Sequence, residues 1–194
     1  MASNYPSFTN DELDSIKKEL GEISKNRVND YDKTVKSFTK YPKQKQLIRV
    51  NFYLNQLLPQ VDMLNQKTSD HWETPKEFLK CGYGDCEDYA IIKYFTLIKL
   101  GFDKDKLFIT TVYEQYSGGY HMVLSYFNSK NKPPLILDNL SFRVLDLQTR
   151  KDLKADIFIN ESGNYKLTKE NKLIRTTKPS LKFLDLLKRI KKEN

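Results

Sequence analysis

The sequence predicts an α+β fold in which helices come first and an antiparallel sheet follows. Apolar residues recur at helical spacing through residue 100, and beyond it the apolar runs become short, β-branched and aromatic. A length of 194 residues, of which 39% are hydrophobic, is enough for one domain with its own core. We expect a single domain, 1–194, made of an N-terminal helical part (1–60), a core that carries the candidate site (61–170) and a C-terminal amphipathic helix (171–194).

The first 60 residues predict helices. Capping oxygens and acidic side chains at 7–12 indicate a helix start, and we expect a helix over about 10–24. Residues 25–43 resemble a short helix or a loop that ends near Pro42. A broad apolar face on 44–58 predicts a further helix.

Residues 74–101 predict two helices joined by a short loop. Thr74 occupies an N-cap position, Pro75 the first helical position, and Glu77 completes a capping box. A second helix over 86–100 would end at Gly101. This second helix is apolar over most of its circumference, which is typical of a helix at the centre of a fold. Beyond its first turn the polar residues form one stripe, Lys93, Thr96 and Lys99.

The remaining chain favours strands, followed by a last helix. Gly118-Gly119 and the polar residues 128–134 predict turns, and 180–190 predict an amphipathic helix. The expected strands are 107–113, 120–126, 135–137, 142–147 and short runs near 157–159 and 165–167.

The net charge of +8 permits binding to nucleic acid, anionic lipid or an acidic protein. The lysines are spread along the chain except at its C-terminal end, so we favour a solvated basic surface and expect no nucleic-acid partner. No apolar run approaches the roughly 18 residues that cross a bilayer. The first residues lack the basic and apolar segments of a signal peptide.

The two cysteines, Cys81 and Cys86, lie five residues apart. A disulfide between them would close a very small loop at the start of a helix, so we expect both to be free. So few cysteines exclude a disulfide framework, and no Cys/His cluster has zinc spacing.

Cys86 heads the expected central helix, His121 begins a strand and Asp138 closes one. If the two strands form a hairpin, their loop is centred between about residues 129 and 131, which brings 121 within a few positions of 138. Asp138 could then accept a hydrogen bond from one imidazole nitrogen while the other faces the thiol, as nucleophilic acyl transfer requires. Each residue alone is more often structural, but their joint placement favours a Cys-His-Asp enzyme. We interpret the other histidine, His71, as a loop residue.

Acidic residues surround the candidate nucleophile. With Asp85 as the N-cap, the helix dipole favours a Cys86 thiolate and the first-turn amides could stabilise an oxyanion. Asp85, Glu87 and Asp88 oppose the thiolate, because like charge raises the pKa of a thiol. A bound cation would offset them; the simpler alternative is that these acids only pair with the helix dipole.

Four blocks of sequence together resemble a known family, the bacterial transglutaminase-like cysteine proteinases of the LapG type. The similarity covers about residues 45–170, and its most specific part is Gly-Asp-Cys-Glu-Asp-Tyr at 84–89. The blocks are Trp-Glu-Thr-Pro with Glu-Phe-Leu (72–79), Gly-Tyr-Gly-Asp-Cys-Glu-Asp-Tyr-Ala (82–90), His-Met-Val-Leu (121–124) and Ile-Leu-Asp-Asn (136–139), with weaker similarity at 49–51 and 158–165.

This resemblance implies a papain-like, transglutaminase-like core. It implies that Cys86 is the nucleophile, His121 the general base and acid, and Asp138 the residue that orients the imidazole. It also implies Ca²⁺ dependence, with Asp85 and Glu87 or Asp88 as ligands. Carboxylates suit a hard cation, and backbone carbonyls or water would complete the shell.

The family cleaves the N-terminal region of a large repeat adhesin beside paired alanines, which releases the adhesin and disperses biofilm. An inner-membrane cyclic di-GMP receptor sequesters the protease, and the resemblance implies a periplasmic location. Small residues at the cut fit a narrow cleft with aromatic walls, for which Trp72, Tyr83 and Tyr120 are candidates; a core role for Trp72 is an equal alternative.

Two alternatives to a calcium-dependent endopeptidase stay open. The same triad could transfer the acyl group to an amine, which is transglutaminase activity. The chain could instead be a non-catalytic basic binding module that docks through residues 180–192, although a packing helix with a solvated basic face explains that segment more simply.

Overall fold

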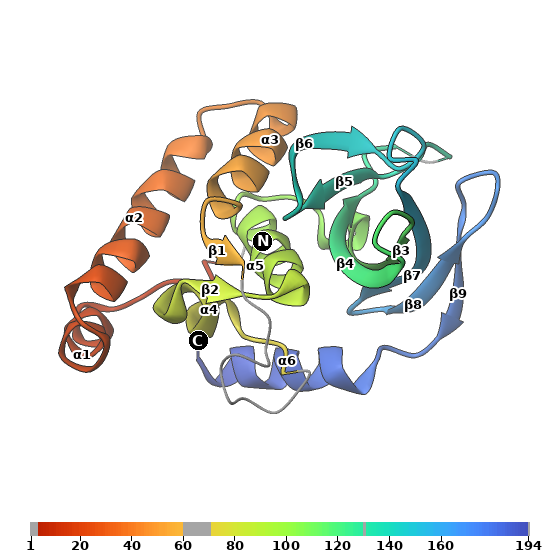
Figure 1. The fold of residues 1–194 in the computed structure, drawn as a ribbon. Helices are drawn as coiled ribbons and strands as arrows, with labels where there is room; N and C mark the ends of the chain where they lie inside the picture. The colour runs from red at the N-terminus through yellow and green to blue at the C-terminus, as the bar shows by residue number, and fades with distance from the viewer. Residues whose placement is uncertain (1–3, 60–70, 130, 194) are drawn as a thin grey trace.

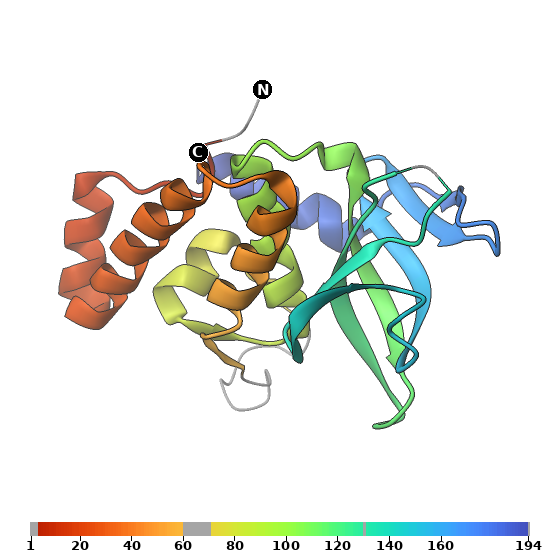
Figure 2. The same ribbon diagram turned by 90° about the horizontal axis from the view of Figure 1, so that it is seen from above.

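The computed structural model describes residues 4–59, 71–129 and 131–193. It confirms the α+β class: a helical part lies beside a seven-stranded sheet (Figures 1 and 2). The boundary expected between residues 60 and 61 lies outside the described residues.

The helices are α1 (Asn10–Leu20), α2 (Glu22–Phe38), α3 (Lys43–Leu54), α4 (Pro75–Cys81), α5 (Cys86–Lys99), the 3₁₀ turn η2 (Lys104–Lys106) and α6 (Leu181–Lys192). The strands are β1 (Leu58–Pro59), β2 (Tyr83–Gly84), β3 (Leu107–Glu114), β4 (Gly119–Tyr126), β5 (Leu135–Asp138), β6 (Ser141–Asp146), β7 (Leu153–Asn160), β8 (Gly163–Leu167) and β9 (Leu173–Thr177).

The N-terminal helices differ from the prediction at Gly21. A single helix over 10–24 is wrong, because α1 ends before Gly21 and α2 begins directly after it. Gly21 has a φ of 86°, which interrupts the helix and which glycine adopts without strain. The segment after it is a long helix rather than a short helix or loop. Its apolar residues recur at helical spacing and are buried: Val28, Tyr31, Val35 and Phe38.

Helix α5 is central, as predicted. It packs against β3, β4 and β5 on one side and against α3 and α4 on the other (Figure 1). Two members of its polar stripe face the N-terminal helices: the Thr96 and Tyr31 hydroxyls are 2.8 Å apart, and Lys99 Nζ donates to Asp32 Oδ1 at 2.7 Å. The third member, Lys93, is fully buried, and its ammonium has no hydrogen-bond partner among the described residues.

The large sheet has the strand order β6-β5-β4-β3-β7-β8-β9, with every neighbouring pair antiparallel. Strands β4 and β5 pair Leu124 with Leu137, so the expected hairpin is present. Strand β9 was not predicted, because it is a mostly exposed edge strand held by its ladder to β8. The boundary expected at residue 170 lies in the turn between β8 and β9, so the last segment contributes a strand as well as α6.

The two faces of the sheet belong to different clusters. Leu124 and Leu137 join the main core with α5, whereas the other face holds a small separate cluster. Successive strand residues point to opposite faces, so His121 and Val123 share the face away from Leu124. The second cluster consists of Val112, Val123, Ile136 and Leu153.

The segment that leads to α5 is anchored at both ends. Thr74 caps α4 and Glu77 bonds back to the Thr74 N–H, the capping box that the sequence predicts. Thr74 Oγ1 also donates to Glu193 Oε1 at 2.8 Å, which ties α4 to the end of α6. At the other end of α4, Arg27 Nη1 donates to two carbonyls of the last turn at 3.0 and 2.7 Å. Helix α4 therefore holds a fixed position before the turn into α5.

Across the described ranges, no helix is long and apolar enough to span a membrane.

We expect Thr74→Ala to lower the free energy of unfolding by about 2 kcal/mol, because it removes the cap of α4 and the bond to Glu193. Thr9→Ala is the matched control: Thr9 caps α1 with the same capping box but is exposed, so its loss should cost about 1 kcal/mol. Urea unfolding measures both. Equal costs would contradict a contribution from the Glu193 contact.

Candidate active site

Cys86 is the first residue of α5, and the turn before it depends on two glycines. Gly82 has a φ of 82°, and a Cβ there would lie 2.2 Å from the Arg27 guanidinium carbon. A Cβ on Gly84 would lie 2.7 Å from Asp88 Oδ2. Only glycine allows these approaches, which explains the Gly-x-Gly spacing before the cysteine. The turn sets the thiol at a helix N-terminus, where the dipole favours an anion.

The Cys86 thiol lies between its own helix and β4. The sulfur accepts a hydrogen bond from the Met122 N–H, one residue along β4 from His121. Its proton is donated to Glu87 Oε2 at 3.2 Å. Burial, together with the adjacent Glu87 carboxylate, raises the pKa of the thiol far above its usual range. The acidic neighbours therefore oppose the thiolate, as the sequence predicts, and burial opposes it more strongly.

His121 and Asp138 are in direct contact, as the hairpin arithmetic predicts. His121 Nε2 lies 2.8 Å from Asp138 Oδ1, and both side chains are buried. Because this contact uses Nε2, the imidazole keeps Nδ1 for a second partner. The pair on β4 and β5 has the arrangement that the base and the orienter of a triad require, and it lies beside the strand residue that contacts the Cys86 sulfur.

Asp138 is fully buried yet ionised. Burial disfavours its charge, but His121, the Leu140 N–H and Arg150 outweigh burial and lower the pKa of Asp138 to about 2. Arg150 Nη2 donates to Asp138 Oδ2 at 2.7 Å. Asn55 Nδ2, from the residue that follows α3, donates to the Asp138 carbonyl at 2.7 Å.

Sequence reasoning missed Arg150 and Asn55. Arg150 lies in a polar turn between β6 and β7 and resembles an ordinary solvated charge. Asn55 is far from the motif residues in the chain. The available signal was indirect: a buried aspartate beside a histidine needs a second partner for its remaining oxygen.

A cluster of acids lies around the start of α5. Asp88 Oδ1 accepts the Glu73 N–H at 2.7 Å, and Oδ2 accepts the Asp85 N–H at 3.2 Å. Burial, then the charges of Asp85 and Glu73, raise the pKa of Asp88 to about 9. Glu73 itself is buried and was not predicted. Glu87 instead contacts the thiol.

Within the described part of the chain, no three His, Cys, Asp or Glu side chains are grouped as metal ligands. Nevertheless, the carboxyl groups of Glu73, Asp85 and Asp88 interact in a mostly buried place, since the charges of Asp85 and Glu73 raise the pKa of Asp88. Their hard oxygen donors fit Ca²⁺, with the rest of a six- to eight-oxygen shell left to carbonyls or water. The donor chemistry therefore fits a calcium ion.

The three expected cleft walls differ in exposure. Trp72 is buried in the main core, with Lys182 Nζ 5.6 Å from its ring, which favours the core alternative; its role as a cleft wall stays a prediction. Tyr83 is half-buried in β2. Tyr120 is 76% exposed beside His121, and its ring packs edge-on against Tyr113. Tyr83 and Tyr120 keep the exposure that a cleft wall requires.

The other histidine and the other cysteine are not part of the His121–Asp138 pair. His71 lies 3.5 Å from Glu77 and contacts Arg189 of α6, in keeping with a loop residue. Cys81 and Cys86, both among the described residues, are not joined by a disulfide.

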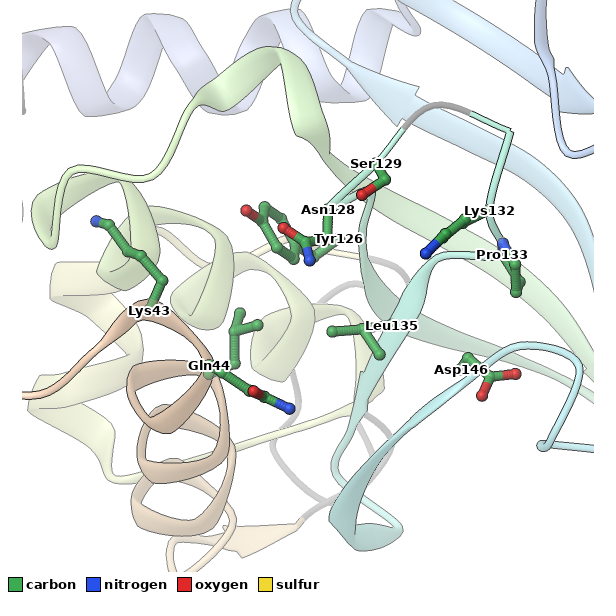
Figure 3. Close-up of a pocket in the computed structure, with 10 residues that line it drawn as sticks. Lys43, Gln44, Tyr126, Asn128, Ser129, Lys132, Pro133, Leu135 and Asp146 are labelled. Carbon is green, nitrogen blue, oxygen red and sulfur yellow. The ribbon is translucent and has the colours of Figure 1, made fainter.

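A hollow of about 350 Å³ lies at another place on the molecule (Figure 3). It is formed by the start of α3 and the loop between β4 and β5, with Lys43, Tyr126 and Leu135 in its wall. None of Cys86, His121 and Asp138 lines it.

Residues 22–152 match the family described as bacterial transglutaminase-like cysteine proteinase BTLCP. The chain also resembles solved structures of Legionella pneumophila LapG. The calcium-bound structure is 34% identical with a TM-score of 0.78, over 92% of this chain and 98% of that one. A second is 31% identical with a TM-score of 0.78, over 95% and 97%, and the EGTA-treated structure is 33% identical with a TM-score of 0.76, over 92% and 97%. No curated protein matches.

These matches confirm the resemblance inferred from the motif blocks. The family match includes the glycine turn, Cys86, His121 and Asp138. The LapG structures extend the similarity over more than nine-tenths of the chain, and the expected transglutaminase-like fold with a central helix on an antiparallel sheet is confirmed. The chain therefore belongs to the bacterial transglutaminase-like cysteine proteinases.

Proposed function

We propose that this chain is a calcium-dependent cysteine endopeptidase that cuts the N-terminal region of a large surface adhesin near paired alanines. The observation that carries the proposal is the buried His121–Asp138 pair, 2.8 Å apart, next to the strand residue that contacts the Cys86 sulfur. Family membership supports the reaction class, and the likeness to a calcium-bound LapG supports the metal.

In this proposal Cys86 transfers its thiol proton to His121 Nδ1, and the sulfur attacks the scissile carbonyl carbon. His121 then gives that proton to the departing amine, leaving a thioester on Cys86. His121 next deprotonates a water molecule, whose oxygen attacks the thioester carbon. The C–S bond breaks, the carboxyl product leaves, and His121 returns the proton to the Cys86 sulfur. Asp138 holds Nε2, so that the ring keeps one orientation and its protonated form is stabilised.

The helix N-terminus supplies the second element of catalysis. The first amides of α5 point out of the helix and would stabilise the oxyanion that forms on the carbonyl oxygen. Tyr83 and Tyr120 are the proposed aromatic walls beside the thiol, and a narrow cleft between them would select small residues at the cut.

The proposed calcium ligands are Asp85 and Asp88, with a third carboxylate from Glu73 or from Glu87. Bound there, the ion would supply positive charge that offsets the acids around the thiol. Asp85 and Asp88 would hold it while they cap the start of α5, so the metal and the nucleophile share one helix end.

The wider setting follows from the same family. We propose a periplasmic location, a large repeat adhesin as substrate, and sequestration by an inner-membrane cyclic di-GMP receptor. Control of cell adhesion and biofilm release would follow from cleavage.

The decisive experiment mixes the protein with the N-terminal fragment of a large adhesin from the same genome, with calcium and with EGTA. One discrete cut that needs calcium supports the proposal. A cut in both conditions would contradict the proposed calcium dependence but would still support the proposed Cys-His-Asp triad. Incorporation of a labelled primary amine without a cut would favour the acyl transferase, and neither product from a folded fragment would favour the binding module.

We expect Cys86→Ala to lower the rate of cleavage at least about 1,000-fold, because the nucleophile is lost. Cys81→Ala is the matched control, since Cys81 is the other cysteine of the chain, five residues earlier, and should keep full activity. Thermal unfolding should change little in either variant. Residual cleavage by Cys86→Ala near the unaltered rate would eliminate the proposed nucleophile.

We expect Asp85→Asn to weaken calcium binding at least about tenfold, because it removes one ligand charge, whereas asparagine still caps a helix. Calorimetric titration measures the affinity, and the rise of the melting temperature with calcium gives a second readout. Asp156→Asn, on the surface of β7, is the control. The same titration on Glu73→Gln and Glu87→Gln identifies the third carboxylate. Unchanged affinity in Asp85→Asn would contradict the assignment.

A further inference from the structure

We propose that Arg150 is a positioning residue of the active site, which fixes the Asp138 carboxylate toward His121 and holds its negative charge. The inference rests on the proposed function, since it assigns Arg150 a part in the same reaction. Arg150 is thereby added to the proposed Cys-His-Asp set as a fourth side chain, one that acts only by positioning Asp138.

The first argument is how the two oxygens of Asp138 are divided. Oδ1 accepts from His121 Nε2 at 2.8 Å and from the Leu140 N–H at 2.9 Å. Oδ2 accepts from Arg150 Nη2 at 2.7 Å. Asp138 has no exposed surface, so water does not replace any of these partners. Without Arg150, Oδ2 would be a buried oxygen with no donor, and the carboxylate could turn away from His121.

The second argument is that the fold holds the guanidinium in place. Asp146 builds the turn after β6 by accepting from the Thr149 N–H and hydroxyl at 2.9 and 2.8 Å. Asp152, after the turn, binds Arg150 Nε through both oxygens at 2.9 and 3.0 Å. Arg150 itself is only 8% exposed. Because Asp152 fixes the buried Arg150 guanidinium, Nη2 of Arg150 is held in one position relative to the Asp138 carboxylate.

The third argument is that the main chain around Asp138 has anchors of its own. Asn55 Nδ2 donates to the Asp138 carbonyl at 2.7 Å and to the Ser141 carbonyl at 3.1 Å. Asn51 Nδ2 donates to the same Ser141 carbonyl at 2.8 Å. Arg150 is thus not needed to hold the β5–β6 turn, and its contact serves the side chain. A change at Arg150 should alter the carboxylate while the fold remains.

The charged groups that face Asp138 come from three elements. His121 faces it from β4, Arg150 and the more distant Asp152 from the β6–β7 turn, and Lys93 from α5. Burial alone would raise the pKa of Asp138, and its neighbours lower it to about 2. A group whose pKa is lowered stays ionised until the pH falls through the lowered value. Removing Arg150 should therefore let Asp138 take up a proton at a higher pH.

The test measures kcat and KM of cleavage against pH for Arg150→Gln and Arg150→Lys. Arg143→Gln, an exposed arginine on β6, is the control. An adjacent opposite charge lowers a carboxyl pKa by about 1–3 units, so Arg150→Gln should move the acid limb of kcat upward by about one pH unit or more. KM should change little, and Arg150→Lys should restore part of the shift because it keeps the charge.

Two further measurements separate positioning from mere support of the fold. In an Asp138→Asn background, where no carboxylate charge remains, Arg150→Gln should cost little additional kcat. In the free protein, the ¹³C titration of the Asp138 carboxyl should move upward in Arg150→Gln and stay unchanged in Arg143→Gln. This titration does not need activity, so it tests the inference even if the adhesin is not the substrate.

An acid limb and carboxyl titration that are unchanged in Arg150→Gln would overturn the inference. The inference would also be overturned if Arg150→Gln lowered kcat by the same factor in the unaltered protein and in the Asp138→Asn variant. If Arg150→Gln does not fold, Arg150→Lys decides: an upward shift of the Asp138 titration supports positioning by the guanidinium, and no shift overturns it.

Discussion

The candidate active site depends on one buried carboxyl group, that of Asp88. It accepts main-chain N–H groups from Glu73, before α4, and from Asp85, at the cap of α5. Two segments that are separate in the chain are thereby fixed to the first turn of the helix that carries Cys86. A side chain on residue 84 would collide with the Asp88 carboxyl group, so the hydrogen bonds of Asp88 need a glycine at this position. The position of the thiol follows from this arrangement.

The site joins two parts of the fold that are built differently. The thiol belongs to the helical part, whereas His121 and Asp138 belong to the sheet, where strand pairing sets their separation. Arg150 reaches Asp138 from a turn, and Asn55 reaches it from the residue after α3. Elements from both parts of the fold therefore contact Asp138, so the position of Asp138 depends on how the helical part packs against the sheet.

The sequence allowed much of this to be predicted, because the informative signals were local. The capping box at Thr74, the cap at Asp85 and the hairpin between β4 and β5 depend on near neighbours in the chain. Arg150 was missed because its burial depends on where the β6–β7 turn lies against β5. The extent of α2 was not predicted, because the helix expected over 10–24 was carried across Gly21 and only a short helix or a loop was expected after it. Strand β9 was missed because an exposed edge strand has little apolar patterning to recognise.

The division of the site between helix and sheet has a mechanical consequence. The position of α5, and with it Cys86, relative to β4 depends on the side chains packed between them, among them Leu124 in the main core. A substitution that changed the packing between α5 and β4 would therefore move Cys86 relative to the His121–Asp138 pair without touching any of the three residues.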